Sequence, residues 1–252
     1  MSEQDSKTFP AAGSSSTSNF DIGGRAVNAG DGVEWIKQGW QLFVKNPGIW
    51  IAITLILMVI MIVLGFIPIL GQLASQFLMP VFMAGLLLGC RSLTNGEELR
   101  IDHLFAGFKE NAGNLMMVGV FYLIGVALIM VITFVIGGSA ALTGGLMGRG
   151  SGASMAIGGM LLAGLVFLAL MVPLWMAVYF APALVVFHNI APMEAMKASF
   201  AACLKNMVPF LVYGIILFVL CIIAAIPFGL GLLVLLPVIF GSTYAAYVAL
   251  YE

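Results

Sequence analysis

The chain has 252 residues, of which 62% are hydrophobic and only 8% are charged, and its formal net charge is −1. Soluble domains are about 45–50% apolar and about 25% charged, so a water-soluble globular protein is excluded. The lack of a basic excess also argues against a nucleic-acid partner, because neutralising phosphates requires Lys and Arg.

The first 32 residues are rich in Ser, Gly, Asn and Asp and show almost no apolar periodicity. Such a segment cannot bury enough apolar surface to offset its chain entropy, so 1–32 is predicted to be a disordered tail. The first apolar run begins near Ile49, behind this polar leader, which argues against a cleavable signal peptide. The remainder, 33–252, is predicted to be one transmembrane domain.

The transmembrane domain contains six apolar segments separated by Gly- and Pro-rich turn signals. A helix needs about 20 apolar residues to cross roughly 30 Å of hydrocarbon. The sequence therefore predicts an all-α integral membrane protein with six transmembrane helices at about 48–67, 70–92, 114–137, 158–188, 207–228 and 230–250. A Gly-rich stretch at about 138–157 is predicted to be a periplasmic loop.

Lys and Arg are distributed unevenly between the two sides that this topology defines. Arg149 alone falls on the side of the Gly-rich loop. The other nine precede the first span, lie at the end of the second span, or follow the second and fourth spans: Lys7, Arg25, Lys37, Lys45, Arg91, Arg100, Lys109, Lys197 and Lys205. Since positive charge marks the cytoplasmic side, both termini are expected to be cytoplasmic.

Three short strings indicate an internal repeat: GWQLFVKN at 39–46, GFKENAGN at 107–114 and SFAACLKN at 199–206. Each begins with a small residue and an aromatic residue and ends with Asn. An acidic residue lies six positions before each aromatic: Glu34, Asp102 and Glu194. The pattern predicts three hairpin units at about 33–93, 101–188 and 192–251. The alternative is that amphipathic helices before membrane spans converge on similar residues.

Each unit is expected to open with a short amphipathic helix on the cytoplasmic side. In the first unit the apolar stripe comprises Val33, Ile36, Trp40, Phe43 and Val44, with spacing typical of a helix face. Such a helix can lie in the head-group region with its aromatic residues among acyl chains and its lysines at the head groups. The candidate interface residues are Trp40, Lys45, Phe108, Lys109, Phe200 and Lys205.

Two further features concern the interior of the spans. Gln72, Ser75 and Gln76 form one polar patch, which is either hydrogen-bonded between helices or part of a polar vestibule. Prolines within spans free backbone carbonyls and kink helices, which either shapes a cavity or allows the bundle to pack. The expected kinks are at Pro80, Pro173, Pro182 and Pro237.

The sequence offers little chemistry. The six spans contain no Asp, Glu or Lys, which argues against a proton-coupled pump. Two histidines and three cysteines without C-x-x-C spacing exclude a His-rich metal site, and no base is available to activate a buried nucleophile. We therefore expect no metal, no cofactor and no enzymatic activity.

The strings LLLGCR (86–91), HLFAGF (103–108), FAPALVVFH (180–188) and PFLVYG (209–214) resemble an uncharacterised family of multi-pass inner-membrane proteins of proteobacteria. More distantly, the layout is similar to the membrane domain of some glycerophosphodiester phosphodiesterases. The resemblance implies a location and a topology, but no mechanism. The expected role is to organise lipids or partner membrane proteins. The alternative is a facilitator or transporter of an apolar or amphiphilic small molecule.

Overall fold

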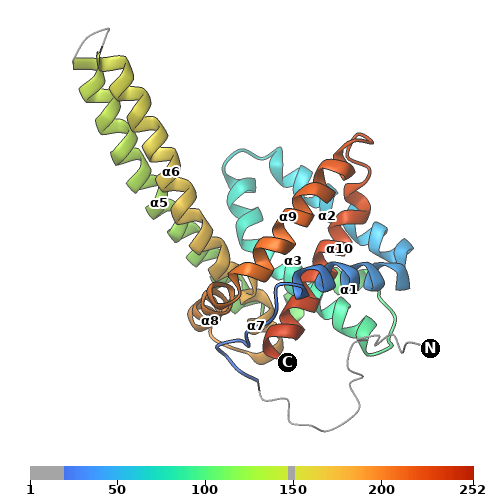
Figure 1. The fold of residues 1–252 in the computed structure, drawn as a ribbon. Coiled ribbons are helices and arrows are strands. Elements are labelled where there is room, and N and C mark those ends of the chain that lie inside the picture. Colours follow the sequence, from blue (N-terminus) through green and yellow to red (C-terminus); the bar gives the residue numbers. More distant parts are fainter. Residues whose placement is uncertain (1–19, 147–150) are drawn as a thin grey trace.

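A computed structural model describes residues 20–146 and 151–252 of the chain, and within these ranges all regular structure is helical (Figure 1). Six helices or helix pairs are long and apolar enough to cross a membrane, which confirms the predicted number of spans. The elements are α1 (Asp31–Lys45), α2 (Pro47–Gly65), α3 (Leu70–Thr94), the 3-10 helix η1 (Ile101–Phe105), α4 (Ala106–Lys109), α5 (Ala112–Leu146), α6 (Ser151–Tyr179), α7 (Ala181–His188), α8 (Pro192–Lys205), α9 (Met207–Ala225) and α10 (Leu232–Tyr251).

The order of short and long helices recurs three times along the chain. A short helix (α1, η1–α4 or α8) is followed by a first span (α2, α5 or α9) and a second span (α3, α6–α7 or α10). Asn46 and Asn206 each end a short helix and precede a first span by one residue. In the middle segment this joint lies at Asn111, whose positive φ of 62° is tolerated by Asn, so α5 begins before Asn114.

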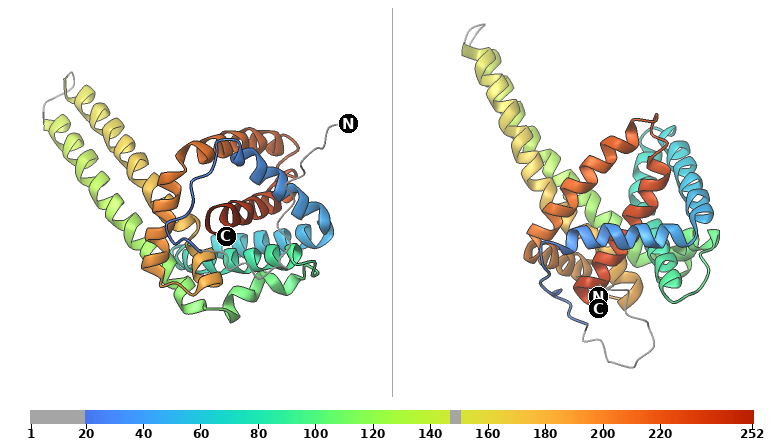
Figure 2. Two further views of the ribbon diagram at one scale, coloured as in Figure 1. Left: turned by 60° about the horizontal axis from the view of Figure 1, so that its bottom comes forward. Right: turned by 45° about the vertical axis from the view of Figure 1, so that its right-hand side comes forward.

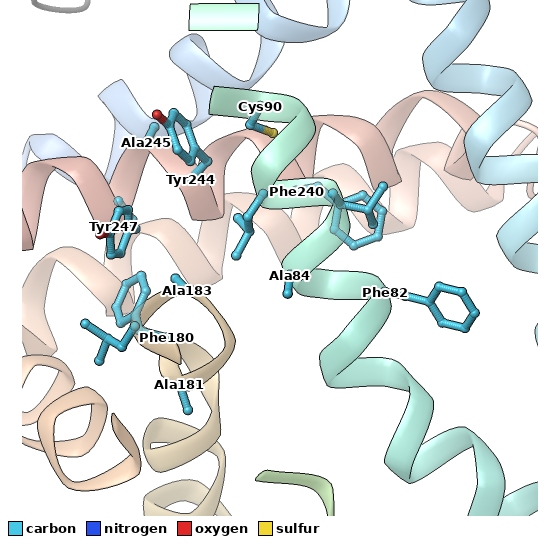
Figure 3. Packing of buried hydrophobic residues seen from close by; sticks show 14 of the residues in the cluster. Phe82, Ala84, Cys90, Phe180, Ala181, Ala183, Phe240, Tyr244, Ala245 and Tyr247 are labelled. Carbon is cyan, nitrogen blue, oxygen red and sulfur yellow. The ribbon is translucent and has the colours of Figure 1, made fainter. Parts of the chain in front are cut away.

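The core lies where the second spans meet near the short helices. Figure 3 shows Ala84 and Cys90 of α3, Ala183 of α7 and Ala245 of α10, and all four are buried. The small side chains allow the helices to approach closely. Aromatic rings complete the packing: Phe187 contacts Tyr244 and Tyr247 with centroid separations of 6.1 and 5.1 Å.

The prolines have two different consequences. Pro80, Pro173 and Pro237 lie inside continuous helices. Pro182, in contrast, lies at the beginning of α7, after a break at Phe180. The Ser199 hydroxyl accepts a hydrogen bond from the Phe180 N–H at 2.9 Å and donates one to the Met176 carbonyl at 2.6 Å. This hydroxyl occupies the place of the backbone bond between residues 180 and 176, which explains why the helix breaks here.

The predicted periplasmic loop at about 138–157 is wrong as a loop. Helix α5 continues to Leu146 and α6 starts at Ser151, so only 147–150, which are not described, connect them. A Cβ on Gly144 would meet the Gly152 carbonyl, and one on Gly159 would meet the Ala140 side chain. The glycines therefore allow two membrane helices to pack closely rather than forming a flexible connection.

The hairpin of α5 and α6 extends beyond the rest of the bundle and diverges from it (Figures 1 and 2). Its helices contain 35 and 29 residues, more than the roughly 20 that a membrane crossing needs. The compact part of the bundle comprises the other four spans and the base of this hairpin (Figures 1 and 2).

The predicted disorder of 1–32 is wrong for its last third. Residues 1–19 are outside the described ranges, but 20–30 lie against the helices and α1 already begins at Asp31. The Asn206 side chain accepts a hydrogen bond from the Val27 N–H at 2.8 Å and donates one to the Arg25 carbonyl at 2.9 Å. The Lys205 ammonium donates to the Gly24 carbonyl at 2.8 Å. These bonds satisfy backbone N–H and C=O groups that water would hydrate in a disordered tail.

Candidate functional site: lateral grooves and a central cavity

Each short helix packs on a second span that belongs to a different segment of the chain. Helix α1 packs on α10, the η1–α4 pair packs on α3, and α8 packs on α6. Figures 1 and 2 show α1 and α8 at the end of the bundle opposite the turns of its hairpins. We call this end the short-helix face. Because the three contacts form a closed cycle, the short helices link all three hairpins.

A small residue lies at each of these crossings. A Cβ on Gly39 of α1 would meet the Val238 carbonyl of α10, and one on Gly107 of α4 would meet the Val81 carbonyl of α3. Val238 directly follows Pro237, and Val81 directly follows Pro80, so each carbonyl belongs to the residue after a proline within a helix. At the third crossing Ser199 of α8 inserts its hydroxyl into the end of α6. The small residues that begin the three repeated strings therefore all contact the backbone of a second span near its proline.

A cavity of about 320 Å³, which is partly open to the outside and is called the central cavity below, lies at the level of the prolines, between α3, α5, α6, α7 and α10. This volume is at the lower end of the range of ligand pockets. Pro80 and Pro182 line it, and so do four polar side chains: Gln76, Tyr122, Tyr179 and Thr243. The apolar part of its lining comes mainly from Met79, Met83, Trp175, Val178, Ile239 and Phe240. None of the lining residues carries a charge.

A first groove, of about 770 Å³, lies on the outside of the bundle between α6, α8 and α9. Its lining is almost entirely apolar and includes Phe167, Met171, Val208 and Leu211. Trp175 and Tyr179 line both this groove and the central cavity. These two side chains therefore stand between the lateral surface and the interior.

A second groove, of about 700 Å³, lies between α9 and α10, which meet at the turn 226–231 and diverge towards α1 (Figure 1). Helix α1 closes its base with Ile36, Lys37, Trp40 and Gln41. Leu220 and Ile223 form part of one wall. The groove is thus apolar along the spans and polar at one end, as an amphiphile requires.

The predicted interface aromatics differ in exposure. Trp40 is 51% exposed and lies at the base of the second groove, Phe108 is 37% exposed, and Phe200 is half-buried. Phe108 also contacts Phe82 of α3, with ring centroids 5.5 Å apart. Helix α1 has a second apolar face, with Trp35 and Leu42 buried against the protein, while Val33, Trp40 and Val44 face outward.

The predicted interface lysines have specific partners or surroundings. The Lys45 ammonium donates a hydrogen bond to the Leu93 carbonyl at the end of α3, at 2.8 Å. The Lys205 ammonium donates a hydrogen bond to the Gly24 carbonyl. Lys109 lines a polar pocket of about 500 Å³ together with Glu97, Glu98, Arg100, Asp102 and His103. In the described ranges, no group of three His, Cys, Asp or Glu side chains is placed to hold a metal ion.

The predicted polar patch on α3 is divided. Gln76 lines the central cavity, whereas Gln72 is exposed and does not line it, and the Ser75 hydroxyl donates to the Gln72 carbonyl of its own helix at 2.7 Å. Sequence reasoning missed Tyr122, Trp175 and Thr243. The spacing of Trp175 and Tyr179, one helical turn apart on an apolar helix, was the available signal for a shared face.

The comparisons with known proteins point to a membrane protein of the same length class. A probable inner membrane protein of Burkholderia thailandensis is 26% identical over 227 residues, which represent 87% of this chain and 82% of the relative. No protein-family model matches the chain. No solved structure matches it.

Proposed function

We propose that this chain is a non-enzymatic, multi-pass protein of a bacterial inner membrane that binds and organises membrane lipids. The observation that carries the proposal is the pair of laterally open apolar grooves, of about 770 and 700 Å³. Grooves of this kind between membrane helices would be filled by acyl chains, because their lining along the spans is almost entirely apolar. The relative's description as a probable inner membrane protein supports the location.

Lys37 favours an amphiphile with an acidic head group in the second groove. It lines the base of the groove beside Trp40, and its ammonium lies 3.5 Å from Glu34 at an exposed position. A lysine at the membrane surface attracts anionic lipid with about 1 kcal/mol. Trp40 adds an aromatic ring of the type that prefers the head-group region.

The proposal includes three equivalent hairpins and a cytoplasmic short-helix face. The cyclic contacts of the three short helices, and the small residue at each crossing, support a threefold repeat. The basic residues of the described segments lie in the short helices, in the segments that precede α1 and η1, or, for Arg91, in the last turn of α3, and this distribution supports a cytoplasmic location for both termini. A distant relationship to the membrane domains of glycerophosphodiester phosphodiesterases stays a prediction from the sequence layout.

A second candidate function is the transfer of a small apolar or amphiphilic molecule. The observation that favours it is the central cavity, which shares Trp175 and Tyr179 with the first groove. A third expectation, a membrane-protein partner, would use the α5–α6 hairpin, which projects from the bundle (Figure 1).

Native mass spectrometry of the full chain, released from membranes of defined composition, tests the lipid-binding proposal. The wild type is expected to retain phospholipid. Ile223→Trp places a bulky ring in the second groove and should reduce retention, because Ile223 lines that groove. Ile222→Trp is the matched control, since Ile222 does not line the groove and the two residues are 53% and 55% exposed. Retention of no phospholipid by the wild type, or equal retention by both variants, would contradict the proposal.

A further inference from the structure

The central cavity excludes charged ligands. All of its lining side chains are neutral, and Gln76 lies in α3, one of the helices that are long and apolar enough to cross a membrane. An ionised phosphate or carboxylate that enters the cavity would lose hydration without gaining a partner of opposite charge, which is strongly unfavourable. A molecule that occupies the cavity is therefore uncharged.

Two of the four polar side chains in the cavity already have partners. The Thr243 hydroxyl donates to the Ile239 carbonyl at 2.9 Å, and the Tyr179 hydroxyl lies 3.2 Å from the Thr243 oxygen. Since Thr243 uses its proton on Ile239, Tyr179 is the donor of the second bond. Both protons are therefore committed to the protein itself.

The other two polar groups are unpaired. Across the described ranges, the Gln76 amide and the Tyr122 hydroxyl have no hydrogen-bond partner, although both line the cavity. A Cβ on Gly119 would lie 2.5 Å from the backbone carbonyl oxygen of Gln76. Helix α5 therefore crosses α3 closely, one turn before Tyr122. Both groups stay accessible from the cavity, because neither is among the buried polar atoms that lack a partner in the described ranges. A hydrogen-bond acceptor that enters the cavity can therefore bond to both of them.

We infer that the central cavity binds a neutral, lipid-soluble molecule whose head carries a carbonyl oxygen, held by the Gln76 amide and the Tyr122 hydroxyl. Such a molecule reaches the cavity from the first groove, past Trp175 and Tyr179, which line both spaces. Trp175 is 63% exposed and can move without disturbing the core. The inference deepens the second candidate function by naming a ligand class, but it requires binding only and no net transport.

Titration of the purified full chain with decylubiquinone, a neutral carbonyl compound with a short chain, tests this site. Saturable quenching of tryptophan fluorescence is expected, with most of the quenching lost in Trp175→Phe while the ligand still raises the thermal unfolding midpoint of that variant. Gln76→Leu and Tyr122→Phe should each weaken binding about five- to tenfold, the effect of one hydrogen bond between groups in a membrane protein.

Gln72→Leu is the matched control, because Gln72 lies one turn from Gln76 on α3 but is exposed and outside the cavity lining. It should bind decylubiquinone as the wild type does, and laurate, which is charged, should not compete. Absence of saturable binding, equal affinities of the Gln76→Leu and Gln72→Leu variants, or effective competition by laurate would each overturn the inference. Phospholipid retention, measured on the same preparations, reports separately on the lateral grooves.

Discussion

Ser199 shows how much one small side chain decides at a helix crossing. Gly39 and Gly107 hold the corresponding positions of the other two repeated strings, and the second spans that they contact, α10 and α3, continue through their prolines. Ser199 instead bridges Phe180 and Met176, and α6 ends there. The hydroxyl is buried, so both of its bonds form without competition from water.

Ser199→Ala should lower the free energy of unfolding by about 1–3 kcal/mol, because it removes the partner of a buried backbone N–H. Ser75→Ala is the matched control and should be nearly neutral, since the Ser75 hydroxyl bonds only to a carbonyl of its own helix near the surface. Thermal unfolding of both variants in the same detergent measures the difference. If the two variants unfold at the same temperature, the bridging role of Ser199 is wrong.

The sequence revealed residue types better than residue contacts. The positions of Trp40 and Gln76 on amphipathic or apolar helices were readable from spacing, and Gln76 does line the cavity. The bonds of Lys45 to Leu93 and of Lys205 to Gly24 were not readable, because their partners are backbone carbonyls 48 and 181 residues away. Every residue has a backbone carbonyl, so the sequence does not indicate which carbonyl accepts a hydrogen bond. A lysine near a helix end therefore predicts a contact with head groups whether or not it bonds to a carbonyl.

At the scale of elements, the order and approximate limits of the six spans follow from hydrophobic length alone, because a membrane crossing needs about 20 apolar residues.

Glycine, in contrast, can indicate either a loop or a close helix crossing in this chain. The Gly-rich stretch between the third and fourth spans reads as a loop, yet Gly144 and Gly152 support close helix packing there. Local sequence cannot separate these cases, because the deciding contact comes from a second helix.

Gly39→Ala should destabilise the protein, because its Cβ would press on the Val238 carbonyl and lie 2.7 Å from the Ser242 nitrogen. Overpacking of this kind costs about 1–3 kcal/mol, which exceeds the helix propensity gain of up to about 1 kcal/mol. Gly214→Ala, in α9 with open space around its Cβ, provides the control and should be neutral or stabilising. Thermal unfolding midpoints compare the two, and equal shifts would argue against a tight α1–α10 crossing.

At the scale of the whole molecule, the proposed threefold arrangement links fold and orientation. If each hairpin crosses the membrane twice, as we propose, all three short helices lie on one side. The exposed lysines Lys37, Lys109 and Lys197 supply one labelling position in each short helix, and Phe228 marks the opposite turn. Native thiols interfere little: Cys90 is buried, burial raises the pKa of Cys203 to about 12, and the half-exposed Cys221 can be replaced.

Cysteines introduced one at a time at Lys37, Lys109 and Lys197 should react with a membrane-impermeant maleimide only in inside-out vesicles. A cysteine at Phe228 should react only in intact, outer-membrane-permeabilised cells. Reaction of the three lysine positions from different sides would rule out both the repeat and the proposed topology. Agreement among the three with the opposite orientation would reject only the cytoplasmic assignment.

The cyclic pairing of short helices with second spans also has a consequence for biogenesis. Helix α1 is among the first elements to leave the ribosome, while its partner α10 is the last. Until α10 has been synthesised, the surface of α1 around Gly39 lacks its neighbour, although Trp35 can already pack on Phe210 of α9, and the closed cycle cannot form. A nascent chain stalled before residue 232 would therefore expose this surface to membrane chaperones and quality-control proteases, and assembly of the three hairpins is coupled to the synthesis of α10.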